Sequence, residues 1–215
     1  ARFDPETYSD AVAFARIGEG SLGGKARGLA FMNSMILKHR LYDKHANVRI
    51  MIPRSVVIAT DYFDDFIRLN GLKYIISQEF SDEEILSEFV SSTVPAKLQQ
   101  ELKAYIQTVR TPLAVRSSSK LEDSHYQPFA GIYSTYMIPY VDNGDQMLRL
   151  LLKAVKSVYA SVYFAASRAY IQSSQNLISE EKMAVIIQEV CGTEQDGLYF
   201  PTCSGVARSI NYYPI

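Results

Sequence analysis

Apolar residues recur at helical spacing in several long stretches of the chain. From Lys25 to His39 they are three and four positions apart, which places them on one face of a helix. The region 61–110 shows the same spacing, and the pattern Ser81-x-x-Glu84 within it has the form of a capping box. Helical spacing also continues without a break over 145–170. The pattern therefore predicts one helix after a glycine-rich stretch, a mostly helical middle region and one long later helix.

Other stretches are β-branched and apolar, and are short enough to be strands. We expect the stretches 112–119 and 132–138 to form a hairpin, because an acidic loop joins them. Helices do not always separate the strands, so an α+β fold with a mixed sheet and flanking helices is favoured over a doubly wound sheet. The predicted strands are 50–60, 112–119, 132–138 and 183–190, with shorter ones at 11–17, 197–200 and 205–213.

Composition and charge narrow the function classes. The 215 residues are 47% hydrophobic, which is enough to bury a sizeable core in one domain or two small lobes. A net charge of -1 and a pI near 6.4 argue against a nucleic-acid partner. Apolar runs are too short to span a membrane and the first residues do not resemble a signal peptide, so we expect a cytoplasmic protein. Two cysteines, Cys191 and Cys203, are expected to be reduced and structural.

The glycine-rich stretch "GEGSLGGKARGL" partly fits three phosphate-binding motifs. Gly18, Gly20 and Gly23 spell G-x-G-x-x-G, and Asp43 follows 43 - 23 = 20 positions after the last of them, as in a dinucleotide-binding unit. However, the alternating parallel pattern of such a fold does not follow. A protein-kinase loop would need H-R-D and D-F-G strings, which do not occur, and a Walker A loop fails at both ends.

A more general interpretation of this stretch remains. Glycines at the start of a helix, with a lysine beside them, make a good anion site because backbone N–H groups are free there. The alternative is a flexible loop in which the glycines only relax the turn and Lys25 is solvated. The stretch alone does not decide between the two.

A second cluster, "LAVRSSSKLEDSHYQPFAGIYSTY", places Arg116 at the end of a buried strand. A guanidinium there offers a rigid fork of donors to phosphate oxygens, and Gly131 would let backbone approach them closely. In the alternative interpretation, Arg116 forms an ordinary ion pair with Glu122 or Asp123.

With these strings the sequence resembles the N-terminal ATP-binding domain of the phosphoenolpyruvate synthase and pyruvate phosphate dikinase family, an ATP-grasp relative. The resemblance rests on several ordered strings and extends over most of the chain, from about Gly23 to Val190. The strings are "GGKARGLAFM", "IPRSVVIATDYFDDFI", "LAVRSSSKLED", "FAGIYSTY", "VYASVYFAASRAY" and "AVIIQEV".

The resemblance implies a set of site residues. Lys25 and Arg116 would contact the ATP phosphates and are the catalytic candidates. Gly131 and Thr135 would belong to the loop and strand that cover the nucleotide. Gln188 would lie at the adenine side, with the backbone of Glu189 and Val190 close to the base.

The resemblance also implies an activity and partners. In this family ATP phosphorylates a histidine on a separate swivel domain, which passes the phosphoryl group to pyruvate on a further domain that binds phosphoenolpyruvate or pyruvate. None of His39, His45 and His125 lies in a matching phosphohistidine context. The family's magnesium ligands are expected beyond Ile215, so this chain alone is expected to bind nucleotide weakly and to be inactive.

The expected organisation is a partial ATP-binding domain over 1–215, with a helix-rich subregion at 61–110, an ATP-grasp-like lobe at 111–190 and an incomplete second lobe at 191–215. The sequence departs from the family at Ser119 to Leu121 and at Ile132. These departures leave open a non-catalytic nucleotide-sensing or interaction module. A purely structural domain, in which Arg116 and the acids are salt bridges, is the third possibility.

Overall fold

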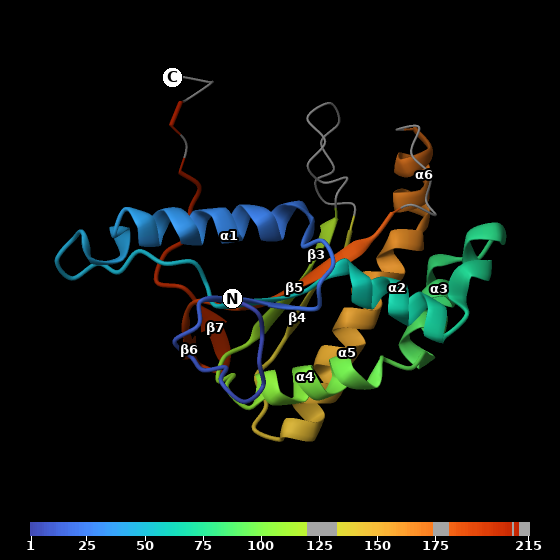
Figure 1. Ribbon diagram of the computed structural model, residues 1–215, viewed down its shortest axis with the longest axis horizontal. Helices are drawn as coiled ribbons and strands as arrows, with labels where there is room; N and C mark the ends of the chain where they lie inside the picture. Colours follow the sequence, from blue (N-terminus) through green and yellow to red (C-terminus); the bar gives the residue numbers. More distant parts are fainter. Residues whose placement is uncertain (120–132, 174–180, 208, 211–215) are drawn as a thin grey trace.

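A five-stranded mixed sheet forms the centre of the protein (Figure 1). The computed structural model describes residues 1–119, 133–173, 181–207 and 209–210. Along the sheet the strand order is β1-β2-β5-β3-β4; β1 and β2 are parallel, and every other neighbouring pair is antiparallel. The predicted α+β fold with a mixed sheet is confirmed. The strands are β1 (Phe14–Ile17), β2 (Ser55–Ile58), β3 (Leu113–Ser119), β4 (Thr135–Ile138) and β5 (Met183–Glu189).

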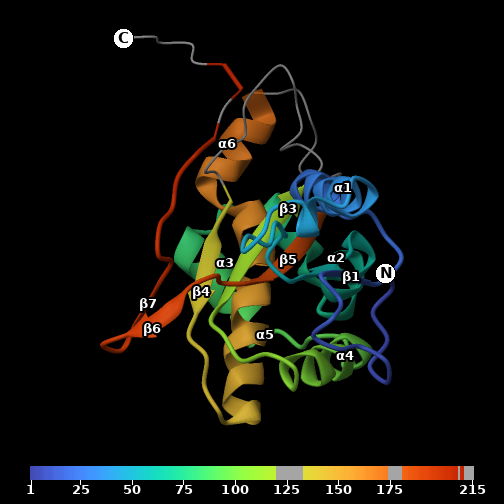
Figure 2. The ribbon, with the colours of Figure 1, turned by 90° about the vertical axis from the view of Figure 1, so that its left-hand side faces the viewer.

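Helices cover both faces of this sheet (Figure 1). Helix α1 lies on one face, and the other face packs against the helices of the middle region and α5. A separate antiparallel pair, β6 (Thr193–Gln195) and β7 (Leu198–Phe200), projects at the edge of the molecule (Figure 2). The α-helices are α1 (Gly23–Lys38), α2 (Thr60–Leu69), α3 (Asp82–Ser91), α4 (Ala96–Ile106), α5 (Gly144–Ala160) and α6 (Ala165–Ser173), with 3-10 turns η1 (Leu41–Asp43), η2 (Leu72–Ser77) and η4 (Ser161–Tyr163).

Alternation along the strands divides the core into two parts. Successive side chains of a strand point to opposite faces. On β5, Val185 and Ile187 join the large core cluster with α2, α4 and α5, whereas Ala184 and Ile186 join a small cluster with Ala26 of α1. The α1 face of the sheet is therefore the face from which even-numbered residues of β5 project.

The chain from β1 to β2 forms a single β-α-β unit, with the glycine-rich loop between β1 and α1. Its second strand is flanked on the other side by the antiparallel β5, so the unit does not extend into a doubly wound sheet. Asp43 lies in η1, away from the end of β2, and pairs with Arg40 at 2.9 Å. Asp43, the acid at the motif's spacing, thus precedes β2 instead of lying at its end, which argues against that motif.

Some sequence predictions were wrong. The helix predicted over 145–170 is interrupted by η4, and Phe164 is extended before α6 begins. No strand forms in the described residues of 205–213, namely 205–207 and 209–210. Cys191 and Cys203 are both free, as expected, but are exposed rather than packed.

The domain division stays a prediction, although the central sheet takes strands both from the first 58 residues and from 113–189. Within the described part of the chain, none of the helices combines the length and the apolar character needed to cross a membrane.

Candidate functional site

The glycine loop after β1 is held by the first turn of α2. Asp61 accepts hydrogen bonds from the backbone N–H of Glu19 at 2.9 Å and of Gly20 at 3.0 Å. Thr60 Oγ1 accepts a third, from the N–H of Ser21, at 3.0 Å. A carboxylate at this position satisfies donors that an anionic ligand would otherwise use. The first half of the loop is therefore a structural junction and not an open phosphate cradle.

The second half of the loop docks the start of α1 onto β3. Gly23 has a φ of +67°, and a Cβ at this position would lie 1.9 Å from the carbonyl oxygen of Ser118. The buried Ser118 hydroxyl donates to the carbonyl of Leu22 at 2.8 Å and accepts from the N–H of Ala26 at 3.0 Å. Only glycine permits this approach. The positive end of the helix dipole is thereby fixed against the end of β3.

Lys25, in the first turn of α1, reaches the same part of β3. Its ammonium lies 3.2 Å from the hydroxyl of Ser117, a residue 92 positions away in the sequence. Ser117 directly follows Arg116 on β3. Lys25 therefore contacts the residue next to the other predicted phosphate-binding residue. The side chains of Arg116 and Ser117 project from opposite faces of the sheet, because neighbouring side chains of a strand alternate. A ligand reached by both Lys25 and Arg116 would lie across the second half of β3.

Arg116 shares one face of the sheet with two other predicted site residues, Thr135 and Gln188. Arg116 is directly opposite Thr135 of β4 and Ile186 of β5 in the strand register. Gln188 projects from the same face, and its Oε1 accepts a hydrogen bond from Arg116 Nη1 at 3.4 Å. This is the face covered by α1 farther along the sheet. The side chain of Thr135 is exposed, whereas Arg116 and Gln188 are half-buried.

Gln188 is fixed between two strands. Its amide Nε2 donates to Ser55 Oγ at 3.2 Å, and that hydroxyl in turn donates to the carbonyl of Pro53 at 2.8 Å. With its Oε1 toward Arg116, the Gln188 amide links the start of β2 to the middle of β3. This chain of contacts orients the Arg116 guanidinium on the sheet.

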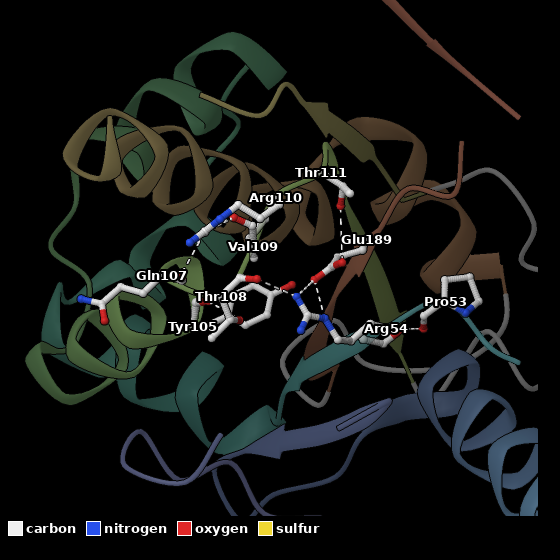
Figure 3. Close-up of polar contacts among 10 residues, drawn as sticks. Pro53, Arg54, Tyr105, Gln107, Thr108, Val109, Arg110, Thr111 and Glu189 are labelled. Atoms are coloured by element: carbon white, nitrogen blue, oxygen red, sulfur yellow. Dashed lines mark hydrogen bonds and ion pairs between the residues drawn. The ribbon is translucent and has the colours of Figure 1, made fainter. Parts of the chain in front are cut away.

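Glu189 and Val190, predicted to lie near the base, are already bonded to neighbouring strands. The N–H of Glu189 donates to the carbonyl of Arg54, and the N–H of Val190 donates to the carbonyl of Pro112, both at 2.9 Å. The Glu189 carboxylate pairs with the Arg54 guanidinium (Figure 3). These two amides are therefore unavailable to a base, and any backbone contact with a ligand would fall to other atoms of this segment.

Some predictions concern residues outside the described part of the chain. Gly131 belongs to this group, as do Glu122 and Asp123, the acids considered as partners of Arg116. In the described part of the chain the Arg116 side chain has Gln188 as a hydrogen-bond partner. The proposed role of Gly131 stays a prediction.

Sequence reasoning missed two residues that shape this region, Asp61 and Arg54. Asp61 was recognisable as a helix-start residue, but its bonds to the glycine loop join positions 41 and 42 residues apart. Arg54 pairs with a residue 135 positions away. No local pattern contains either relationship, and only the sheet topology creates them.

The described residues do not form a metal-binding cluster of their own. Over the described ranges, histidine, cysteine and acidic side chains do not gather in groups of three or more that could hold a metal ion. Oxygen-rich ligand sets are what magnesium requires. No catalytic step is therefore assigned to a metal bound by these residues.

Comparison with known proteins identifies the domain. Residues 19–214 match the family model of the pyruvate phosphate dikinase AMP/ATP-binding domain. An uncharacterised phosphotransferase, YvkC of Bacillus subtilis (strain 168), is 28% identical over 192 residues, which is 88% of this chain and 20% of that protein. The phosphoenolpyruvate synthase of Aeropyrum pernix is 25% identical over 201 residues, covering 83% of this chain and 22% of the enzyme.

The chain spans about a fifth of the length of these curated relatives. The family match covers nearly the whole chain, including α1 with Lys25, β3 with Arg116 and β5 with Gln188. This chain belongs to the pyruvate phosphate dikinase AMP/ATP-binding domain family.

Proposed function

We propose that this chain is the ATP-binding lobe of a phosphotransferase that moves a phosphoryl group from ATP to a histidine on a separate domain, and from there to pyruvate. The observation that carries the proposal is the contact of Lys25 with Ser117, the residue that follows Arg116 on β3. This contact brings the N-terminus of α1 beside Arg116. These features bring two cations and a positive helix end to the second half of β3. The proposal includes a cytoplasmic location, where ATP is available, and magnesium bound with residues outside those described.

Phosphoryl transfer depends mostly on positioning and on electrostatic stabilisation of the phosphate oxygens. In the proposed complex, Lys25 provides a mobile point charge and Arg116 a planar fork held by Gln188. Thr135, an exposed residue opposite Arg116 on the edge strand β4, would donate its hydroxyl to the same ligand. Backbone around Glu189 and Val190 would flank the base.

The test measures ATP binding and phosphohistidine formation in the full-length protein. We expect Lys25→Ala and Arg116→Ala each to weaken ATP binding about tenfold or more, because a hydrogen bond to a charged group contributes about 1.5–3 kcal/mol. Both variants should also lose the acid-labile phosphohistidine formed from labelled ATP. Lys38→Ala, at the exposed far end of α1, is the matched control and should do neither. Unchanged ATP affinity in both folded site variants would refute the proposal.

A non-catalytic nucleotide-sensing module is the second candidate. The bonds from Asp61 to the N–H groups of Glu19 and Gly20 favour it, because they remove phosphate-binding donors from the glycine loop. This candidate predicts ATP binding that depends on Lys25 and Arg116, without ATP consumption or phosphohistidine. Turnover of ATP by the full-length protein would exclude it.

A further inference from the structure

A largely buried ion pair lies where β5 ends. The Nε of Arg54 is 2.6 Å from Glu189 Oε1, and the Nη2 of the same guanidinium also contacts that carboxylate (Figure 3). The side chains of Arg54 and Glu189 are only 11% and 16% exposed. Arg54 immediately precedes β2 and Glu189 is the last residue of β5, so the pair joins two neighbouring strands at one end of the sheet.

The pair also binds the segment between α4 and β3. Arg54 Nη2 donates to the carbonyl of Thr108 at 2.9 Å, and the hydroxyl of Thr111 donates to Glu189 Oε2 at 3.4 Å. Backbone bonds support the same arrangement: Glu189 is bonded to Arg54 and Val190 to Pro112. The end of β5 is thus held by two segments of the chain, the residues before β2 and the segment between α4 and β3.

Stability alone does not explain this cluster. Removing two charges from water costs free energy, and apolar replacements of buried ion pairs are often neutral or stabilising. The surroundings add to that cost, since among the described residues the hydroxyls of Tyr8 and Tyr105 and the Nη1 of Arg54 are buried without a hydrogen-bond partner. Burial also raises the pKa of Tyr8 to about 12. An arrangement with this many polar groups is better suited to fixing a geometry than to strengthening the core.

We propose that Arg54 is a positioning residue: through Glu189 and Thr108 it fixes the backbone at the end of β5 beside the base of the bound nucleotide. The inference rests on the proposed function, which places that backbone at the base. Arg54 does not touch the ligand. It sets the distance between the strand end and the proposed phosphate-binding residues, of which Lys25 contacts Ser117 and Arg116 is held by Gln188.

The test separates the base half of ATP from the phosphate half in the full-length protein. Affinity is measured by calorimetry for ATP and for inorganic tripolyphosphate at the same magnesium concentration. We expect Arg54→Gln to weaken ATP binding about tenfold while tripolyphosphate binding stays within about twofold. Arg54→Lys, which keeps the charge but loses the fork, should be intermediate. Arg68→Gln, which breaks the exposed pair with Asp65, is the control and should change neither affinity.

A second measurement covers the case in which Arg54→Gln is poorly folded. In Glu189→Gln, whose side chain is of the same size, hydrogen exchange of the Glu189 and Val190 amides should become faster, and ATP affinity should fall more than tripolyphosphate affinity. Folded variants that bind both ligands as the parent does, or lose both equally, would overturn the positioning role. Failure of Lys25→Ala and Arg116→Ala to affect ATP binding would instead refute the proposed function, and the inference with it.

Discussion

Asp61 Oδ1 lies 3.0 Å from the amide nitrogen of Gly20, so a carboxylate accepts a bond at the loop that most resembles a phosphate-binding motif. Its other oxygen accepts from the N–H of Glu19 at 2.9 Å. A Cβ on Gly20 would lie 2.6 Å from the backbone nitrogen of Asp61, so a side chain there would disturb this contact. Close packing against α2 thus explains Gly18 and Gly20, and the proposed anion site lies at Lys25 and the start of α1.

Asp61→Asn tests this division of roles. The substitution exchanges one acceptor oxygen for a donor that faces the loop amides, so we expect a loss of about 1–2 kcal/mol in the free energy of unfolding. ATP affinity should fall by no more than about twofold, because the proposed site holds the phosphates at Lys25 and Arg116. Denaturant unfolding and calorimetric titration measure the two effects. Asp65→Asn, on the exposed side of the same helix, is the control. A tenfold loss of ATP affinity would instead indicate that the glycine loop binds the phosphates.

Gly23→Ala should be among the most damaging single substitutions in the chain. A left-handed backbone and a Cβ 1.9 Å from the Ser118 carbonyl oxygen together predict a loss of about 3 kcal/mol or more. Gly28→Ala on the same helix is the control: a Cβ there meets no atom within 4 Å, and alanine should stabilise the helix by about 0.5–1 kcal/mol. Thermal unfolding of both variants provides the comparison. Similar effects at the two positions would show that α1 is not docked through Gly23.

Helix and strand positions with a strong local pattern were predictable from the sequence. The capping box of Ser81 and Glu84 forms as expected, and β3 and β5 occur almost at their predicted bounds. The break in the predicted long helix was not predictable from spacing, because apolar residues continue through it. At the end of α5, the Ser161 hydroxyl donates to the carbonyl of Val158. At the start of α6, Asp82 of α3 accepts a hydrogen bond from the N–H of Ala165, so a residue distant in sequence helps to begin the new helix.

The candidate site divides in the same way. Lys25 and Arg116 were predicted from ordered strings. Lys25 lies at the helix start as expected, whereas Arg116 lies in the middle of β3 and not at its end, because the strand continues through Ser117 to Ser119. The contact of Lys25 with Ser117, and the contact of Gln188 with Ser55, depend on which strands become neighbours in the sheet. A β5 inserted between β2 and β3 could not be predicted from a linear pattern, because long-range pairing leaves no periodic trace.

The start of α3 predicts a specific acid dependence of stability. Hydrogen bonds from the backbone and hydroxyl of Ser81 lower the pKa of Glu84 from its ordinary value of 4.5. Since the folded-state pKa is below the unfolded one, the ionised carboxylate stabilises the folded protein above pH 4.5, and this contribution is lost as the pH falls through the lower, folded-state pKa. The Ser81 N–H lies 2.8 Å from Glu84 Oε2, so the effect is local to the capping box.

Glu84→Gln should therefore be less stable than the parent at neutral pH and approach it in stability in acid, because glutamine retains an acceptor but has no charge to lose. Urea unfolding of the two proteins at several pH values down to about 3 measures the difference, since the carboxylate is protonated only well below its ordinary pKa. Glu83→Gln, which removes a carboxylate from the same helical turn but outside the capping box, is the control. A difference between Glu84→Gln and the parent that stays constant from neutral to acid pH would show that ionisation of Glu84 does not contribute through the capping box.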